Sequence, residues 1–223
     1  MSTESCRILV MASGNGSNFQ AIIDAIGNKI SGANIIRLIV NRSNAYATQR
    51  AEKAGIPWEY FNLVSHGFQA KGEKDSDKIR ESRDKYDAVL AQKVIEYKPD
   101  LIILAGWMYV FGRQFLDPVD AAGIKIINLH PALPGQYDGT NAISRAFDDF
   151  QAGKIKGTGI MVHYVIAQVD RGEPILVREI ECREGETLHE LEDRIHSHEH
   201  ELIVEAAAKV AKEVQERKQI KTQ

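Results

Sequence analysis

Short apolar runs alternate with segments of helical spacing through the first two thirds of the chain. Continuous apolar runs of about four to eight residues are typical of strands buried on both faces. Such runs predict strands at residues 7–12, 34–41, 57–61, 100–106 and 124–130. The third should lie at a sheet edge, because Pro57 lacks an N–H. Helical spacing predicts helices at residues 19–26, 45–54 and 77–97. This alternation indicates an α/β fold, with a twisted, mostly parallel sheet and helices on both faces.

The last third of the chain has a different pattern. A helix is predicted at residues 139–150, and strands are predicted at residues 158–165 and 174–182. Because a short loop joins these two strands, we expect a local antiparallel pair. Thr187 and Glu190 form a capping box, which predicts the start of a long helix over residues 187–215. The polar residues that follow are expected to fray.

The composition is that of an ordinary globular protein, with 223 residues, 43% of them hydrophobic and 26% charged. We expect a single domain over residues 1–223, with residues 1–100, 101–182 and 187–215 as its successive parts. The net charge is 28 − 31 = −3, so the chain lacks the excess of basic residues that is typical of proteins that bind nucleic acid. The longest apolar run, residues 101–112, is too short to span a membrane, and the N-terminus lacks a secretory pattern. With two cysteines, a reduced, cytoplasmic protein is the simplest expectation.

The strongest candidate chemistry lies in residues 124–135, which read IKIINLHPALPG. Asn128 and His130 are two apart at the end of a predicted strand, so their side chains point to the same face. The amide can donate a hydrogen bond to a developing oxyanion, and the imidazole can transfer protons or also donate. Pro131 and Pro134 restrict the backbone just beyond the pair. An ordinary strand end with a capping Asn and a half-buried His fits the same residues.

A glycine-rich turn, residues 13–18, lies between the first predicted strand and helix. This arrangement directs free backbone N–H groups towards an anion. The turn reads G-N-G-S-N, so it lacks both the third glycine of a dinucleotide-binding turn and the G-K-[ST] of a P-loop. We therefore predict a phosphate site that matches no known class of nucleotide-binding motif. The alternative is an ordinary turn between a strand and a helix. Gly16 is expected to be glycine because a side chain there would fill the cradle.

Four of the seven histidines lie in the predicted C-terminal helix: His189, His196, His198 and His200. His196 and His200 are one turn apart, which is a possible zinc face. The pattern is not H-E-x-x-H and no Cys or Asp cluster completes it, so we expect a polar helix face and no metal. Asp170 lies in the loop between the last two strands, where a role in the turn explains it as well as chemistry does.

Four motifs together resemble the folate-dependent phosphoribosylglycinamide formyltransferases of purine synthesis. They are SGNGSN after the first strand, LAGWM after the fourth, NLHPALPG, and GIMVHYV followed by VDRGEPI. The resemblance runs from about Arg7 to Val210. It implies a Rossmann-like α/β sheet and transfer of the formyl group of 10-formyltetrahydrofolate to the amine of glycinamide ribonucleotide. It also implies small-molecule partners only, without nucleic acid, membrane or metal.

The resemblance implies roles for individual residues. Asn128, His130 and Asp170 match the catalytic trio, and we expect Asp170 to favour a cationic His130. The phosphate and ribose of the substrate would be held by Asn15, Gly16, Ser17, Asn18, Arg83 and Glu199. The folate pocket would be formed by Met108, Tyr109, Val110, Phe111, Ile166, Val169 and Asp170. The bond between Leu133 and Pro134 matches one that the family holds in the cis form.

Two features depart from the bacterial members of that family. The loop after His130 is one residue shorter, and Tyr109 replaces an arginine. Since tyrosine carries no charge at neutral pH, we expect the wall at Tyr109 to bind folate by stacking and burial. Three alternatives stay open: another enzyme that uses formyltetrahydrofolate, a dinucleotide-binding oxidoreductase, and a non-enzymatic sensor of phosphoribosyl ligands.

Overall fold

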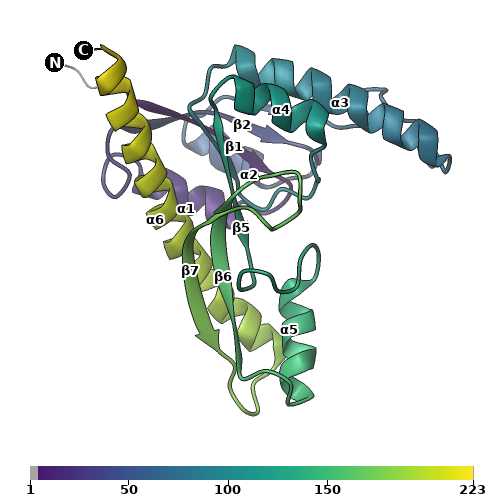
Figure 1. Cartoon of the computed structure of the whole chain (residues 1–223), viewed down its shortest axis with the longest axis vertical. Helices are drawn as coiled ribbons and strands as arrows, with labels where there is room; N and C mark the ends of the chain where they lie inside the picture. The colour runs from purple at the N-terminus through teal and green to yellow at the C-terminus, as the bar shows by residue number, and fades with distance from the viewer. Residues whose placement is uncertain (1–4, 223) are drawn as a thin grey trace.

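The computed structural model describes residues 5–222 and contains a seven-stranded sheet with helices on both faces (Figure 1). The strands are β1 (Cys6–Ala12), β2 (Ala33–Val40), β3 (Trp58–Tyr60), β4 (Leu101–Leu104), β5 (Lys125–His130), β6 (Gly157–Tyr164) and β7 (Pro174–Glu181). The helices are α1 (Ser17–Ala25), α2 (Ala47–Lys53), α3 (Ser76–Glu96), α4 (Arg113–Ala121), α5 (Ala142–Gln151) and α6 (Leu188–Thr222). In this described part of the chain, no helix combines the length and apolar character needed to cross a membrane.

The strand pairing agrees with the predicted topology. The order is β3-β2-β1-β4-β5-β6-β7. The first five strands along the sequence pair in parallel, and β6 pairs antiparallel with both β5 and β7. Strand β3 lies at one edge of the sheet, as Pro57 predicts. The α/β class, the mostly parallel sheet and the C-terminal antiparallel pair are confirmed.

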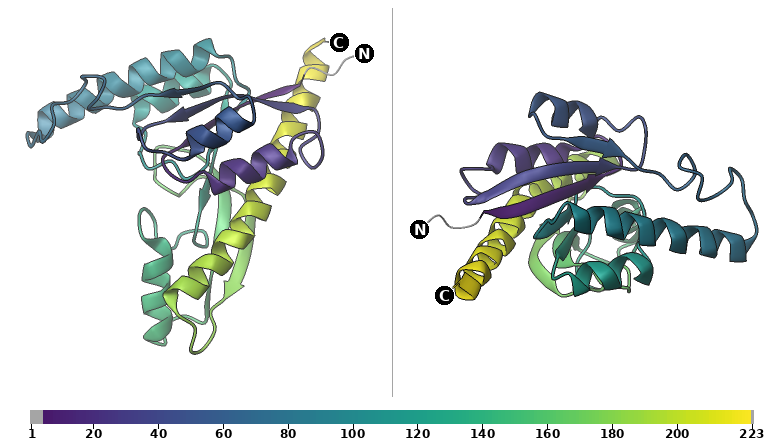
Figure 2. Two further views of the ribbon diagram at one scale, coloured as in Figure 1. Left: turned by 180° about the vertical axis from the view of Figure 1, so that it is seen from behind. Right: turned by 90° about the horizontal axis from the view of Figure 1, so that it is seen from above.

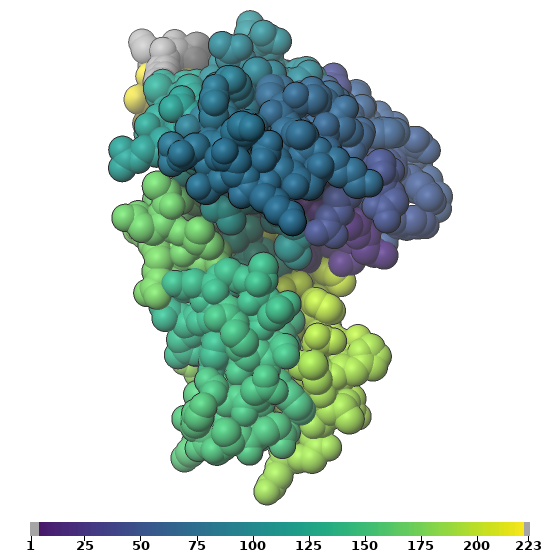
Figure 3. All heavy atoms as spheres, turned by 90° about the vertical axis from the view of Figure 1, so that its right-hand side faces the viewer, coloured from purple at the N-terminus to yellow at the C-terminus, as the bar shows by residue number. Residues whose placement is uncertain are grey.

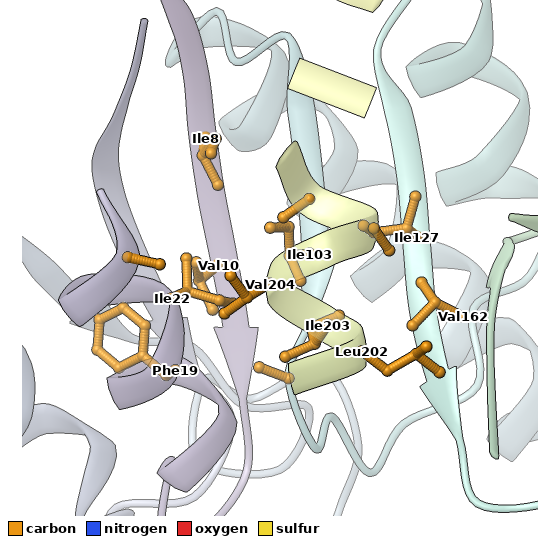
Figure 4. Close-up of a cluster of buried hydrophobic side chains, with 14 of the residues drawn as sticks. Ile8, Val10, Phe19, Ile22, Ile103, Ile127, Val162, Leu202, Ile203 and Val204 are labelled. Carbon is orange, nitrogen blue, oxygen red and sulfur yellow. The ribbon is translucent and has the colours of Figure 1, made fainter. Parts of the chain in front are cut away.

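The buried residues of β1 alternate between two cores on opposite faces of the sheet. Ile8 and Val10 belong to a cluster with residues of α1, α2 and α6, whereas Leu9 and Met11 belong to a cluster with residues of α3 and α4. Figure 4 shows the first cluster, in which Ile203 of α6 lies against the sheet. Figure 2 shows the two helical layers from behind and from above. A strand covered on both faces needs an unbroken apolar run, which is what β1 has.

The sequence pattern does not predict helix α4. Its apolar face consists of Phe115, Leu116 and Val119, which are buried in the same core as α3. The helix has nine residues and contains Pro118, whose missing N–H removes one backbone hydrogen bond. A short segment with an internal proline carries a weak helical signal, so tertiary packing decides its structure here.

Helix α6 is longer than the sequence pattern predicts. Its last turns are held by contacts to the N-terminal half of the chain. Lys218 Nζ donates to Asp100 Oδ2 at 2.7 Å, and Gln215 Nε2 donates to the carbonyl oxygens of Ser31 and Gly32 at 3.0 and 2.8 Å. The helix therefore continues past the predicted end at residue 215, where Lys218, which looks solvated in the sequence, docks on Asp100.

The segments that the sequence singled out meet at one edge of the sheet. Strands β1, β4 and β5 are adjacent and parallel, so the loops that follow them emerge together. Ser13, after β1, donates its N–H to the carbonyl of Gly106 at 3.0 Å and accepts from the Met108 N–H at 2.7 Å. Neighbouring strands are about 4.8 Å apart, which places the β1 and β5 loops roughly 10 Å from each other. Figure 3 shows the surface hollowed between the blue part around α3 and the green part around α5.

Candidate active site

Asn128 and His130 project from the end of β5 onto the sheet face that carries α3 and α4. Ile126, Asn128 and His130 alternate along β5 and so point to the same face, and Ile126 packs in the core on that face. The neighbouring strand β6 adds a polar side chain, because His163 pairs with Asn128 in the antiparallel register. Asn128 Nδ2 and His163 Nε2 are 3.3 Å apart. The two imidazoles, at His130 and His163, are 3% and 2% exposed, so the strand ends form a buried polar cluster.

Asp170 joins this cluster from the loop between β6 and β7. Its backbone is left-handed, with a φ of 54°, which is uncommon for a residue other than glycine. Its Oδ1 lies 3.3 Å from Asn128 Nδ2, and its Oδ2 lies 3.3 Å from His130 Nδ1. The Gly139 N–H donates to Oδ2 at 2.8 Å. The structure thus brings the three predicted catalytic residues into contact with one another.

Asp170 favours the cationic form of His130, but burial of the imidazole opposes it more strongly. Burial lowers the pKa of His130 below its ordinary value of 6.5, and this outweighs the opposing effect of the Asp170 carboxylate. Burial alone would raise the pKa of Asp170, but the His163 imidazole and the Gly139 N–H together hold that pKa below its ordinary value. At neutral pH His130 is therefore neutral and Asp170 ionised. Because a carboxylate can only accept, Nδ1 of His130 carries the proton and Nε2 carries a lone pair.

This assignment predicts the titration of His130. In an NMR titration, the Cε1–H signal of His130 should report a pKa below 6.5. The Asp170→Asn variant should lower that pKa further, since the aspartate charge is what raises it. Comparison with the His130→Gln spectrum identifies the signal. A wild-type titration above 6.5 would mean that Asp170 prevails over burial and that the cation is the resting form.

The glycine turn after β1 leads directly into α1. Gly16 is the N-cap residue, with a φ of 74°, and no side chain caps the helix. The N–H groups of the first turn therefore have no partner inside the helix and point to the carboxyl edge of the sheet. Arg50 of α2 holds the turn, because its guanidinium donates to the carbonyl and side-chain oxygens of Asn15 at 2.9 and 2.8 Å. The turn offers backbone donors beside a cation.

Glu199 of α6 lies next to this turn. Asn18 Nδ2 donates to Glu199 Oε2 at 3.4 Å. Glu199 is 7% exposed, and burial raises its pKa above the ordinary value, against the opposing effects of His196 and Asn18. The structure therefore brings Glu199 together with the turn at residues 15–18, as the resemblance implies.

The histidines of α6 form no visible metal centre. Within residues 5–222, no group of three or more His, Cys, Asp or Glu side chains is arranged to hold a metal ion. His189 faces Asp193 at the surface, with 3.6 Å between Nε2 and Oδ2. His200 is half-buried, and burial lowers its pKa.

Arg83 contacts the segment that was assigned to folate and not the glycine turn. It lies on α3, which covers the opposite face of the sheet from α1 and α6. Its Nη2 donates to the carbonyl of Val110 at 2.7 Å, and its guanidinium lies 4.4 Å from the centre of the Tyr109 ring. The structure therefore does not bring Arg83 together with the other predicted phosphate and ribose residues: its neighbours are those of the predicted folate wall.

The Tyr109 wall also differs from the expectation. The ring is covered by Arg83 and packs edge-on against Tyr86 at 5.2 Å, so the wall is neither charge-free nor an open aromatic face. The exposed side chains of this segment are Met108 and Val110, at 63% and 53%. Phe111 is buried and stacks on Trp107 and Phe115, so it supports the wall only from behind.

A cavity of about 540 Å³ lies on the same sheet face as Asn128. Ile126, two residues before Asn128, lines it together with Leu116 of α4. Val165 and Ile166 line it from the loop that carries Asp170, and Val169 of this loop is exposed. Asp117, Asp120, Lys125 and Glu173 add charged groups to its wall, so the cavity offers a flat ligand both apolar and polar contacts. Ile166 is the predicted folate residue that lines this cavity.

The peptide bond before Pro134 is trans, which corrects the expected cis bond. Among residues 5–222 no peptide bond is cis. The N–H of Gln136 donates to the carbonyl of Leu133 at 3.0 Å, and Gly135 has a φ of 79°. These four residues form a turn with proline in the second position and a left-handed glycine in the third, a geometry that a trans proline satisfies.

Sequence reasoning missed three residues of the site: His163, Gly139 and Arg50. His163 lies in a predicted strand, but its proximity to Asn128 depends on the register between β5 and β6, which the strand pattern does not give. Gly139 acts through its backbone N–H, which any residue type supplies. Arg50 lies in α2, which is separated from the glycine turn by α1 and β2, and no sequence motif links it to Asn15.

Comparison with known proteins agrees with this geometry. The model of the Formyl transferase family matches residues 6–207. Phosphoribosylglycinamide formyltransferase of Schizosaccharomyces pombe is 44% identical over 201 residues, covering 89% of this chain and 94% of that protein. The Dictyostelium discoideum protein of the same name is 46% identical over 202 residues, covering 89% and 95%. The crystal structure of glycinamide ribonucleotide transformylase 1 from Geobacillus kaustophilus superposes with a TM-score of 0.75 at 30% identity, covering 93% of this chain and 99% of that one. The chain therefore belongs to the formyl transferase family and, within it, to the phosphoribosylglycinamide formyltransferases.

Proposed function

We propose that this protein transfers the formyl group of 10-formyltetrahydrofolate to the amine of glycinamide ribonucleotide. The products are N-formylglycinamide ribonucleotide and tetrahydrofolate. One observation carries the proposal: Asn128, His130 and Asp170 are in contact with one another beside the end of β5, at the sheet edge where the loops after β1 and β4 also emerge. Family membership supports the same reaction.

The two substrates would approach the cluster from opposite sides. The ribonucleotide phosphate would sit on the N–H groups at the start of α1, with Glu199 at the ribose. The folate ring would enter the cavity beside Ile126, with its tail passing Val110 and Arg83. Binding at both ends holds the amine against the formyl carbon, which supplies the entropic part of the rate enhancement.

The neutral His130 suits the proton transfers of this reaction. As the amine forms its bond to the formyl carbon, Nε2 of His130 takes the proton that the nitrogen loses. The imidazolium is stabilised by Asp170 at 3.3 Å and can donate Nε2–H to the Gln136 carbonyl, 3.4 Å away. Asn128 donates to the oxyanion through the amide that Asp170 orients. As the bond from carbon to the folate nitrogen breaks, His130 returns the proton to that nitrogen.

One assay tests the proposal. Purified protein is mixed with 10-formyltetrahydrofolate and glycinamide ribonucleotide, and the folate product is followed by absorbance. Formylation that requires both substrates is the expected result. Release of formate without the ribonucleotide would indicate a deformylase, and binding without turnover would indicate a sensor. The proposal includes a cytoplasmic location. It also assigns residues 1–100 to the phosphate and ribonucleotide side, residues 101–182 to the catalytic and folate side, and residues 187–215 to the C-terminal helix. The free, buried Cys6 and Cys182 support the location.

A substitution at Gly14 can test phosphate binding without disturbing the fold. A Cβ at Gly14 would meet no atom within 4 Å, whereas a Cβ at Gly16 would lie 2.7 Å from the Cβ of Ala47 in α2. The need for glycine at position 16 therefore comes from its φ and from α2, and not only from the ligand. Gly14→Val should raise the ribonucleotide KM by about tenfold or more and the formylfolate KM by less than about twofold. Steady-state kinetics with each substrate varied provide the measurement, and equal rises in both KM values would contradict a phosphate role.

A further inference from the structure

Two loops meet beside the catalytic cluster, one after β5 and one between β6 and β7. Asp138 in the first loop faces Arg171 in the second, and Arg171 Nε donates to Asp138 Oδ2 at 2.7 Å. The next residue along the first loop, Gly139, donates its N–H to Oδ2 of Asp170, which precedes Arg171. The ion pair and the hydrogen bond therefore join the same two stretches of backbone, side by side.

The first of these loops needs support to keep its shape. Tyr137 and Asn141 have φ values of 49° and 57°, in the left-handed region that residues other than glycine rarely adopt. Arg145 of α5 donates to the carbonyl oxygens of Tyr137 and Asp138, which fixes the loop to α5. Arg171 holds the opposite side of the loop and ties it to the segment that carries Asp170.

Asp138 also bears on the electrostatics of the cluster. Its charge raises the pKa of His130, in the same direction as Asp170, while burial and His163 lower it. The second carboxylate oxygen of Asp138, Oδ1, is buried and finds no hydrogen-bond partner within residues 5–222. A buried carboxylate oxygen without a partner is costly, so the interactions of the other oxygen must hold this side chain in place.

We propose that Asp138 and Arg171 are positioning residues for catalysis. Their ion pair holds the loop after β5 against the loop between β6 and β7, so that the Gly139 N–H stays on the Asp170 carboxylate. The hydrogen bond keeps Asp170 ionised and directed at His130 Nδ1. The consequence for turnover rests on the proposed function, whereas the consequence for the Gly139 hydrogen bond does not.

The role can be separated from global stability. The ion pair is half-exposed, with side-chain exposures of 52% for Arg171 and 33% for Asp138. Exposed pairs contribute little to the stability of a fold, so breaking this one should leave the melting temperature nearly unchanged. Lys85 and Glu81 of α3 form a control pair outside both loops, at 2.7 Å with exposures of 65% and 66%.

The direct test is the amide signal of Gly139 by NMR. In the wild type, the proton should be shifted downfield and protected from solvent exchange, because it donates to a carboxylate. Arg171→Gln and Asp138→Asn should each remove the shift and increase exchange by about tenfold or more. Lys85→Gln should leave both unchanged. A Gly139 signal that is the same in all four proteins would overturn the proposal, whether or not the protein transfers formyl groups.

Kinetics provide the second readout. Each single variant should lower kcat by about tenfold and change either KM by less than about threefold, as expected for loss of a hydrogen bond to a charged group. In Asp138→Asn the acid limb of the kcat profile should move to lower pH, because the limb follows protonation of the His130 base and the Asp138 charge, which this variant removes, raises the pKa of His130. The double variant should be no slower than either single variant, since both break one contact. Multiplicative losses or an unmoved acid limb would contradict the proposed role.

Discussion

Replacing His130 with alanine should lower kcat by about 10³-fold and change either KM by less than about threefold. The side chain is 3% exposed and meets Asp170 at 3.3 Å, where it can hold a proton between the attacking amine and the leaving nitrogen. Asn128→Ala should lower kcat by about 10²-fold or more, because it removes the donor to the oxyanion. Both substitutions should raise the free energy of the transition state and leave substrate binding nearly unchanged, since neither side chain is needed to hold the phosphate or the folate ring.

Steady-state kinetics at saturating substrate, with binding of a folate analogue measured separately, provide the test. The melting temperature of each variant controls for folding. Gln136→Ala is a matched control beside the same imidazole, because its carbonyl contact to His130 is made by the backbone and survives the change. A His130→Ala variant that keeps more than about a tenth of wild-type kcat would exclude the proposed proton transfer.

Gly172→Ala should destabilise the protein by about 2–4 kcal/mol. A Cβ at this position would overlap the carbonyl oxygen of Tyr164 and lie 3.3 Å from His163 Nδ1. The obstacle is the backbone at the end of β6, so no side-chain rotation relieves it. Because Gly172 is two residues after Asp170, the loop must move away from β6 and take the carboxylate with it. We therefore expect loss of activity together with loss of stability.

Thermal unfolding measures this effect, and a fall of roughly 5–15 °C corresponds to the expected change for a chain of this size. Gly14→Ala is the control, since a Cβ there meets open space and the backbone is not left-handed. A Gly172→Ala protein that melts within about 2 °C of the wild type would show that the loop between β6 and β7 packs less closely than this structure has it.

The sheet could be predicted because each strand is marked by the pattern of apolar residues within its own short stretch of sequence. The unbroken apolar run of β1 follows from burial on both faces, and the parallel order places the ends of β1, β4 and β5 together. The pairing of Asn128 with His130 on one face needs only the period of a strand. These arguments use neighbours in sequence, so they need no knowledge of tertiary contacts.

The remainder of the site depends on contacts between distant segments. Asp170 is a loop residue in the sequence, and only the folding of its loop over β6 gives it partners. Arg83 was grouped with the glycine turn, but it contacts Val110 and Tyr109, because the sequence does not say which face of the sheet α3 covers. The neutral state of His130 arises from burial, which opposes the nearby carboxylate and cannot be weighed without coordinates.

Helix α6 has a consequence for how the protein moves. It packs on α1, β1 and β4 in one half and on β6 and β7 in the other, and its end is tied to Asp100. Because one continuous helix packs on both halves, rotation of one half against the other should be opposed, and we expect closing over the substrates not to be a domain motion. It must come from the loops, chiefly residues 133–141 and 165–173, whose motions take nanoseconds to microseconds where hinge motions of whole domains take microseconds to milliseconds. Opening of the site should therefore be a local event that leaves the amide protons of both cores undisturbed.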